Sequence, residues 1–231
     1  MSINRQIIFT FFILIFTIVF FGITNIDTIV QDNLFDSATQ TWILDRDLQP
    51  YKFIFYDGIK KLLIILAISF LFALVFFRKN EIVKKYKRGI IIVILSAIFV
   101  PVVNGGLKKY TNMPCPKNEI HFGGKMIKTA VWQNYNEPYK SMSKIRCWPA
   151  GHASGGFALL SLFFLFKTNK NKKLAITFAL TIGWSMGIYK MLIGDHFLSH
   201  TIITMMIAWL VILIISIIFQ KGFNIEKSTK I

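Results

Sequence analysis

Six apolar runs divide the sequence, and each is followed by polar or charged residues. The runs cover residues 7–23, 62–77, 89–107, 149–166, 174–193 and 197–219. A transmembrane α-helix needs about 20 predominantly apolar residues, so each run is long enough, alone or slightly extended, to cross a bilayer. A mean hydropathy of +0.55 is also too high for an ordinary soluble domain. The sequence therefore predicts an all-α integral membrane protein with six transmembrane helices in a single membrane domain.

The charges between the runs predict the orientation. Basic residues gather in residues 78–88 and 167–173, and short cytoplasmic loops are enriched in Lys and Arg. We therefore expect these loops and both termini in the cytoplasm, and the loops 24–61 and 108–148 outside. The first run lacks a small-residue cleavage site and is expected to remain as a span. The net charge of +16 lies in these short clusters, which indicates membrane topology and anionic headgroups rather than nucleic acid.

Two local features of the sequence refine this topology. An interfacial helix is expected around Trp42 in the first outer loop, because tryptophan favours the membrane interface. Pro101 and the pair Gly105–Gly106 predict a distorted end to the third span, where the backbone lines protein or water. No internal repeat and no obligate protein partner is indicated by the sequence.

The outer loop 108–148 departs from the charge rule, because it is basic although it is predicted to lie outside. Its acidic residues are Glu119 and Glu137, and its basic residues are Lys108, Lys109, Lys117, Lys125, Lys128, Lys140, Lys144 and Arg146. A solvated basic loop is one interpretation. The other interpretation is a surface that holds an anionic ligand.

Four ionisable side chains reach the same outer face in this topology. Lys108 ends the third span, His152 opens the fourth, Lys190 lies near the end of the fifth and His196 opens the sixth. Ionisable groups at membrane depth are costly, so their convergence indicates a functional cavity. The alternative is that each histidine is an ordinary packed or interfacial residue.

The histidines have distinct local settings. His152 follows Pro149-Ala150-Gly151 at a predicted helix start, where unsatisfied amides favour anions. His196 and His200 are four residues apart and share one helical face. A metal pair is a further interpretation of this spacing, but the spans carry no carboxylate and no HExxH motif. We therefore predict no metal and no other cofactor.

The order and spacing of these residues resemble the three motifs of the type 2 phosphatidic acid phosphatase superfamily. The general pattern is Lys-x6-Arg-Pro, Pro-Ser-Gly-His and Ser-Arg-x5-His-x3-Asp. This sequence has Lys108 followed six residues later by Cys115-Pro116, then Pro149-Ala150-Gly151-His152, then Lys190, His196 and His200. Bacterial members related to lipid A phosphatases are similar in having Cys-Pro and His-Phe-Leu-Ser-His.

The resemblance implies a metal-independent phosphatase. Neutral His196 would attack phosphorus and form a phosphohistidine, and His152 would protonate the leaving oxygen. Lys108 and Lys190 would neutralise the phosphoryl oxygens, together with the amide of Gly151. The substrate implied is a lipid-linked phosphate monoester or diphosphate, with lipid A favoured and polyprenyl diphosphate, phosphatidylglycerophosphate and phosphatidic acid open. The site would face the periplasm from a bacterial inner membrane, with membrane lipids as its partners.

The sequence departs from the family pattern in four places, which involve five residues. The differences are Cys115 for arginine, Ala150 for serine, Tyr189-Lys190 for Ser-Arg, and His200 for aspartate. Arg146 is a candidate replacement for the missing arginine. His200 would orient His196 only when neutral, and Asp195 is a candidate substitute if it lies in the turn.

Cys115 and Cys147, the two cysteines of the chain, share the outer loop. A disulfide between them is chemically permitted in a periplasm and would connect the first two motifs, whereas two free thiols are the alternative. Three other functions remain open. They are a lipid phosphotransferase that uses the same phosphohistidine, a membrane protein in which His152 and His200 ligate haem or a metal, and a catalytically degenerate scaffold.

Overall fold

The computed structural model describes the backbone of residues 2–141 and 145–228 and the side chains of residues 2–140 and 145–219. Lys144 therefore lies outside the described residues. The regular elements, in chain order, are α1 (Ile3–Ile23), α2 (Ile26–Asp32), β1 (Phe35–Asp36), β2 (Thr41–Trp42), a π-helical turn (Phe53–Asp57), α3 (Gly58–Phe76), α4 (Glu81–Leu107), 3-10 turns (Pro116–Asn118, Ile120–Phe122 and Tyr139–Ser141), α5 (Gly151–Ala158), a 3-10 turn (Leu159–Ser161), α6 (Leu162–Leu165), α7 (Asn169–Leu192) and α8 (Leu198–Ser228).

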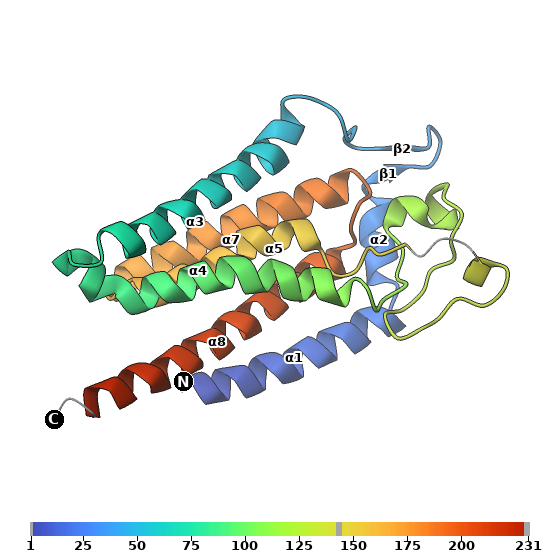
Figure 1. Ribbon diagram of the computed structural model, residues 1–231. Helices are drawn as coiled ribbons and strands as arrows, with labels where there is room; N and C mark the ends of the chain where they lie inside the picture. Colours follow the sequence, from blue (N-terminus) through green and yellow to red (C-terminus); the bar gives the residue numbers. More distant parts are fainter. Residues whose placement is uncertain (1, 142–144, 229–231) are drawn as a thin grey trace.

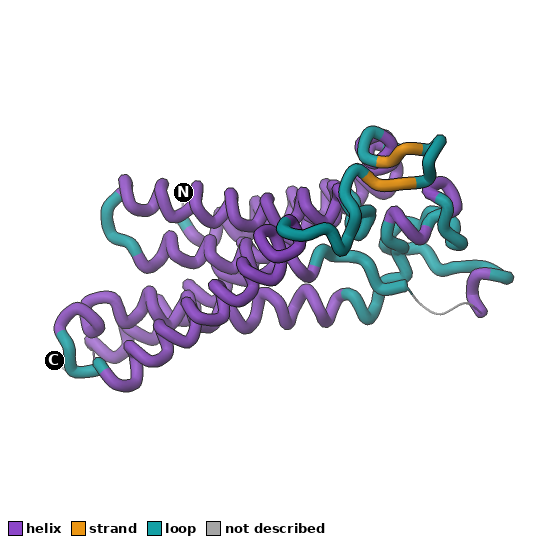
Figure 2. The backbone as a smooth tube through the Cα atoms, turned by 90° about the horizontal axis from the view of Figure 1, so that it is seen from above, coloured by secondary structure: helices purple, strands orange, loops and turns teal. Residues whose placement is uncertain are grey.

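The long helices run roughly along one direction and form an elongated bundle (Figure 1). The start of α1, the end of α8 and the turn between α3 and α4 lie at one end of this bundle. Helix α2, the β1–β2 hairpin and the loop between α4 and α5 lie at the other end, which we call the loop end (Figures 1 and 2). The two long loops thus share one end, and the helix termini at positions 3 and 228 share the opposite end.

Five described helices are long and apolar enough to cross a membrane. They are Ile3–Ile23, Phe53–Phe76, Glu81–Leu107, Asn169–Leu192 and Leu198–Phe219, and the apolar helix Gly151–Leu165 is shorter. Their apolar faces are largely unburied within the protein, as expected where lipid replaces protein contacts. The prediction of an all-α, multi-pass membrane protein is confirmed, with the small β1–β2 hairpin as an addition. Of the six predicted spans, five are helices of sufficient length among the described residues, and the fourth is the shorter segment Gly151–Leu165.

Helix α5 occupies the interior of the bundle and contacts α4, α7 and α8. Its Gly156 faces Gly183 of α7 so closely that a Cβ at Gly156 would lie 2.7 Å from the Gly183 Cα. Small residues allow two membrane helices to approach in this way. Phe157 is fully buried beside this contact. The packing fixes the start of α5, and therefore His152, relative to α7.

The helices extend beyond the apolar runs that predicted them. The second helical segment begins at Phe53 rather than residue 62, because Lys60 and Lys61 continue the helix and their long side chains can reach water. Helix α4 begins at Glu81 rather than residue 89, where the Ile82 amide donates to the Asn80 side chain. Helix-forming Glu and Lys residues therefore prolong the helix past the hydrophobic stretch.

One local expectation is wrong. Trp42 is not in an interfacial helix but in β2, where it pairs with Phe35 and packs on Phe122, with ring centroids 5.3 Å apart. The helix of this loop is α2 instead. Helix α4 passes through Pro101 and ends at Leu107, the end of the predicted run, and the expected distortion of its last turns stays a prediction.

Candidate active site

The loop end of the bundle brings together most of the side chains predicted from the sequence. Lys108 follows α4, Gly151 and His152 open α5, and Lys190 lies in the last turn of α7. His196 is in the turn before α8, and His200 is in the first turn of α8. These residues come from three separate segments of the chain, near positions 108, 151–152 and 190–200, so the tertiary fold creates the cluster.

His196 and His200 form the buried part of the cluster. Their Nδ1 atoms are 3.2 Å apart, and their side chains are 3% and 0% exposed. Only one of these nitrogens can carry the shared proton in the neutral pair. Burial, together with His200 and Lys108, holds the pKa of His196 well below its ordinary value. The ring of His196 is therefore neutral, and its lone pair at Nε2 is free when Nδ1 donates to His200.

His152 is half-buried at the start of α5, and its ring centroid lies 6.2 Å from that of His196. The ring packs edge-on against Tyr56, at a centroid distance of 4.9 Å. Its Nδ1 is buried and has no hydrogen-bond partner among the described residues. A single phosphoryl group can bridge two rings at this separation.

Lys108 lies directly against the start of α5. A Cβ at Gly151 would lie 3.1 Å from the Lys108 Cε and 3.4 Å from its Nζ, so the glycine leaves room for the ammonium group. Burial lowers the pKa of Lys108, and Asp195 partly opposes this effect. Ala150 at the helix N-cap has no side-chain acceptor for the first amides of α5. An anion beside Lys108 would satisfy both the ammonium group and these amides.

Lys190 is buried and contacts two groups of the site. Its Nζ is 3.0 Å from Asp195 Oδ2 and 4.4 Å from the ring centroid of Tyr56. Asp195 also pairs with Arg46 and with Lys117, whose Nζ is 2.8 Å from Oδ1. Although burial acts to raise it, Lys117 and Lys190 hold the pKa of the Asp195 carboxyl below its usual range. Asp195 is thus a charged anchor for three cations.

Asp195 lies in the turn between α7 and α8, as its suggested role requires, but neither its carboxylate nor the Arg146 guanidinium bonds to His196. His196 Nδ1 faces His200, while the Asp195 carboxylate is held by its three cations, so Asp195 does not orient the nucleophile. Arg146 is exposed, does not line the cavity beside His152, and has no hydrogen bond or ion pair with any described residue. Arg46 and Lys117 join the cluster through their ion pairs with Asp195, and neither lies at a family motif position.

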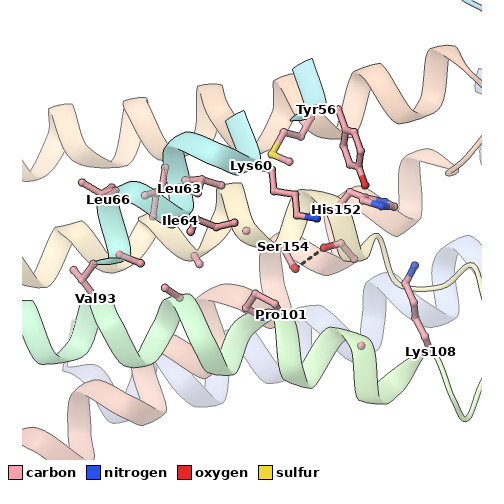
Figure 3. Close-up of a pocket in the computed structure, with 18 residues that line it drawn as sticks. Tyr56, Lys60, Leu63, Ile64, Leu66, Val93, Pro101, Lys108, His152 and Ser154 are labelled. Atoms are coloured by element: carbon pink, nitrogen blue, oxygen red, sulfur yellow. Dashed lines mark hydrogen bonds between the residues drawn. The ribbon is translucent and has the colours of Figure 1, made fainter. Parts of the chain in front are cut away.

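A cavity of about 490 Å³ opens beside His152 and extends between α3, α4 and α5. Tyr56, Lys60, Lys108 and His152 point toward its polar end (Figure 3). Apolar side chains line the rest, namely Leu63, Ile64, Leu66, Ala67, Val93, Ala97, Pro101, Ala158, Leu159 and Met186. No sequence pattern singles out Tyr56 or Lys60, because both precede the second apolar run. His196 does not line this cavity, but its ring lies next to that of His152, with centroids 6.2 Å apart.

Cys115 and Cys147 form a disulfide, with Cα atoms 5.2 Å apart. Neither cysteine of the chain is a free thiol. Cys147 Sγ is 3.5 Å from His196 Nδ1, so the bond joins the Lys108 segment to the wall of the histidine pair.

Removing this disulfide is expected to destabilise the protein. The bond closes a loop with a sequence separation of 32, which corresponds to about 3 to 4 kcal/mol in the chain-entropy treatment. We expect the Cys115→Ser/Cys147→Ser variant to lose about that much unfolding free energy in a denaturant titration in detergent. Reductant should lower the stability of the wild type and leave the variant unchanged. Equal stability with and without reductant in the wild type would contradict this expectation.

The cluster does not fit a bound metal or haem. The ligand atoms of Cys147, His196 and His200 lie within 4.8 Å of one another, but the Cys147 sulfur is bonded to Cys115 and is not a thiolate. His200 is fully buried and packs against the rings of His196 and Phe197, at 5.5 and 5.4 Å. Because Nε2 of His200 is buried within the protein, a porphyrin cannot approach it in this packing.

The fold and the site define the chain as a multi-pass helical membrane protein with histidines and lysines gathered at one end of its bundle. The family model described as the PAP2 superfamily matches residues 89–223, which is more than half of the chain. The protein belongs to the PAP2 superfamily, whose members are phosphatases that act on phosphate esters. No curated protein and no solved structure gave a match.

Proposed function

We propose that this phosphatase hydrolyses a lipid-linked phosphate monoester or diphosphate at the periplasmic face of a bacterial inner membrane. Lipid A is the favoured substrate, because the Cys-Pro and His-Phe-Leu-Ser-His segments resemble lipid A phosphatases. The disulfide favours the periplasmic side for the loop end, since such bonds persist in oxidising compartments. Both termini are then cytoplasmic.

One observation carries the proposal. Lys108 and His152 line one end of the cavity, and Lys190 lies against Tyr56 at the same end. The remaining walls are apolar, and helix α3, which is exposed to lipid, forms one of them. A phosphate at the polar end places the adjoining part of the substrate in the apolar part. A lipid phosphate has this combination of a charged head and an apolar body.

The mechanism has two steps. In the first step, Nε2 of neutral His196 attacks phosphorus, the bond to the leaving oxygen breaks, and His152 protonates that oxygen. In the second step, His152 accepts a proton from water, the water attacks the phosphohistidine, and inorganic phosphate leaves. His200 accepts the Nδ1 proton of His196 in a hydrogen bond and stabilises the positive charge that develops there.

Charge stabilisation comes from the lysines. Lys108 and Lys190 neutralise the non-bridging oxygens, and the Gly151 amide at the start of α5 donates to one of them. Asp195 keeps Lys190 beside the reacting group through the 3.0 Å contact. No step of this mechanism uses a metal ion.

A panel of lipid phosphates tests the proposal. The purified protein is incubated in detergent with lipid A, polyprenyl diphosphate, phosphatidylglycerophosphate and phosphatidic acid, in the presence of EDTA. We expect release of inorganic phosphate, fastest from lipid A. Transfer of phosphate to an acceptor lipid without release would indicate a phosphotransferase instead. Failure to convert any of these lipids would contradict the proposal.

The pH dependence of kcat/KM should show the lowered pKa of His196. Because this pKa lies below the ordinary 6.5, the neutral nucleophile persists into mildly acidic solution, and the acid limb should lie below pH 6.5. Because burial lowers the pKa of Lys108 from 10.5, the alkaline limb should begin below that value. The profile is corrected for the second ionisation of the substrate phosphate, near pH 6. An acid limb at or above pH 6.5 after this correction would contradict the assignment.

A further inference from the structure

The start of α8 has no cap of its own. Phe197 precedes Leu198, the first residue of the helix, and its side chain has no hydrogen-bond acceptor. The first amides of a helix lack partners within the helix and normally bond to a Ser, Thr, Asp or Asn at the N-cap. This helix start carries His196 just before it and His200 within its first turn. Its position therefore decides where the histidine pair lies.

Asp27 of α2 takes the place of the missing cap. The Ser199 amide donates to Asp27 Oδ1 at 2.9 Å, and the Ser199 hydroxyl donates to Oδ2. Both side chains are 1% exposed, so water does not compete for these bonds. The two residues are 172 positions apart in sequence. An acidic group at a helix N-terminus is also favoured by the helix dipole.

Helix α2 holds the neighbouring helix as well. Gln31, one turn after Asp27, donates from Nε2 to the Met191 carbonyl at 2.7 Å and is fully buried. Met191 directly follows Lys190 at the end of α7. Helix α2 is thus hydrogen-bonded both to the end of α7, next to Lys190, and to the start of α8. The turn between these two helices carries Asp195 and His196.

The surroundings of Asp27 explain how α2 is kept in place. Lys128 of the outer loop donates to Asn25 Oδ1 at 3.0 Å and to Thr28 Oγ1 at 3.1 Å. Glu119 is buried nearby, and burial raises its pKa to about 8. Burial likewise raises the pKa of Asp27 to about 6, and its bonds to Ser199 oppose that rise. No contact joins Asp27 to His196 or His200 directly.

We propose that Asp27 is a positioning residue for the phosphatase reaction, which caps α8 from another helix and thereby sets the place of the His196–His200 pair. The inference rests on the proposed function only in taking His196 as the nucleophile. A shift of about 1 Å in a reacting group can cost a hundredfold in rate, so a loosened helix start should slow the chemical step. Asp27 lies away from the substrate cavity, so substrate binding should change little.

The kinetic test compares four variants with the wild type on the best lipid phosphate. Asp27→Ala is expected to lower kcat by about 10- to 100-fold and to change KM less than about twofold. Asp27→Asn keeps an acceptor for the Ser199 amide and should recover part of kcat. Ser199→Ala keeps the amide bond and should lose less than Asp27→Ala. Asp32→Asn is the matched control on the same helix and should behave as the wild type, since the Asp32 side chain is exposed and its one side-chain partner among the described residues is exposed His121.

Hydrogen exchange provides a measurement that does not depend on activity. In the full-length protein, the segment 195–204 should exchange faster in Asp27→Ala, less so in Asp27→Asn, and at the wild-type rate in Asp32→Asn. If Asp27→Ala does not fold, the kinetic constants and the hydrogen exchange are measured on the Asp27→Asn and Ser199→Ala variants instead. Unchanged exchange, unchanged kcat, or a loss confined to KM would overturn the inference. Faster exchange together with an inactive wild type would instead overturn the proposed function and leave the capping contact intact.

Discussion

Replacing His196 by alanine is expected to lower phosphate release by about 10,000-fold or more, because removal of a nucleophile eliminates the covalent route. KM should change much less, since the cavity is lined by other residues. The measurement is inorganic phosphate release under saturating lipid phosphate, with circular dichroism to show that the variant is folded.

His121→Ala is the matched control for this loss. His121 is exposed and pairs with Asp32 at 2.6 Å, away from the cluster, so its replacement should leave the rate unchanged. Equal phosphate release by wild type and the His196→Ala variant would show that His196 is not the nucleophile.

Replacing His152 by alanine is expected to lower the rate by about 100- to 10,000-fold, the usual contribution of a general acid or base. The loss in the first step should depend on the leaving group. An alkyl or lipid alcohol needs a proton as it leaves, whereas an aryl phosphate with an acidic phenol does not. Single-turnover measurements with both kinds of substrate separate these cases.

The leaving-group comparison distinguishes acid catalysis from a structural role. If His152 merely packs against Tyr56, both substrates should lose the same factor in the first step. A clearly smaller loss with the aryl phosphate supports the assignment. Equal losses would remove His152 as the general acid and leave its packing against Tyr56 as its role.

Hydrophobic run length and loop charge were enough to predict the membrane fold. They also placed Lys108, His152, Lys190 and His196 at one end of the bundle, because each lies at the same end of its span. The helix ends were less well predicted, since polar helix formers such as Glu81 prolong a helix outside the apolar core.

The contacts that hold the segment around His196 and His200 in place could not be predicted in the same way. The Asp27–Ser199 contact joins residues far apart in sequence, and neither residue belongs to a local pattern. Arg46 and Lys117 meet at Asp195 for the same reason, since the conformation of long loops depends on tertiary packing. Residues at the ends of the apolar runs were therefore predictable, whereas residues that complete the site through long-range contacts were not.

The most direct test of the central claim is detection of the phosphohistidine itself. The His152→Ala variant is mixed with an aryl phosphate, which needs little acid catalysis to form the intermediate but still lacks the base for its hydrolysis. The reaction is quenched in alkali, because phosphohistidine is unstable in acid, and the peptides are analysed by mass spectrometry. We predict one phosphoryl group on His196. Continued phosphate release with no phosphoryl group on His196, or with one on a different residue, would contradict the account.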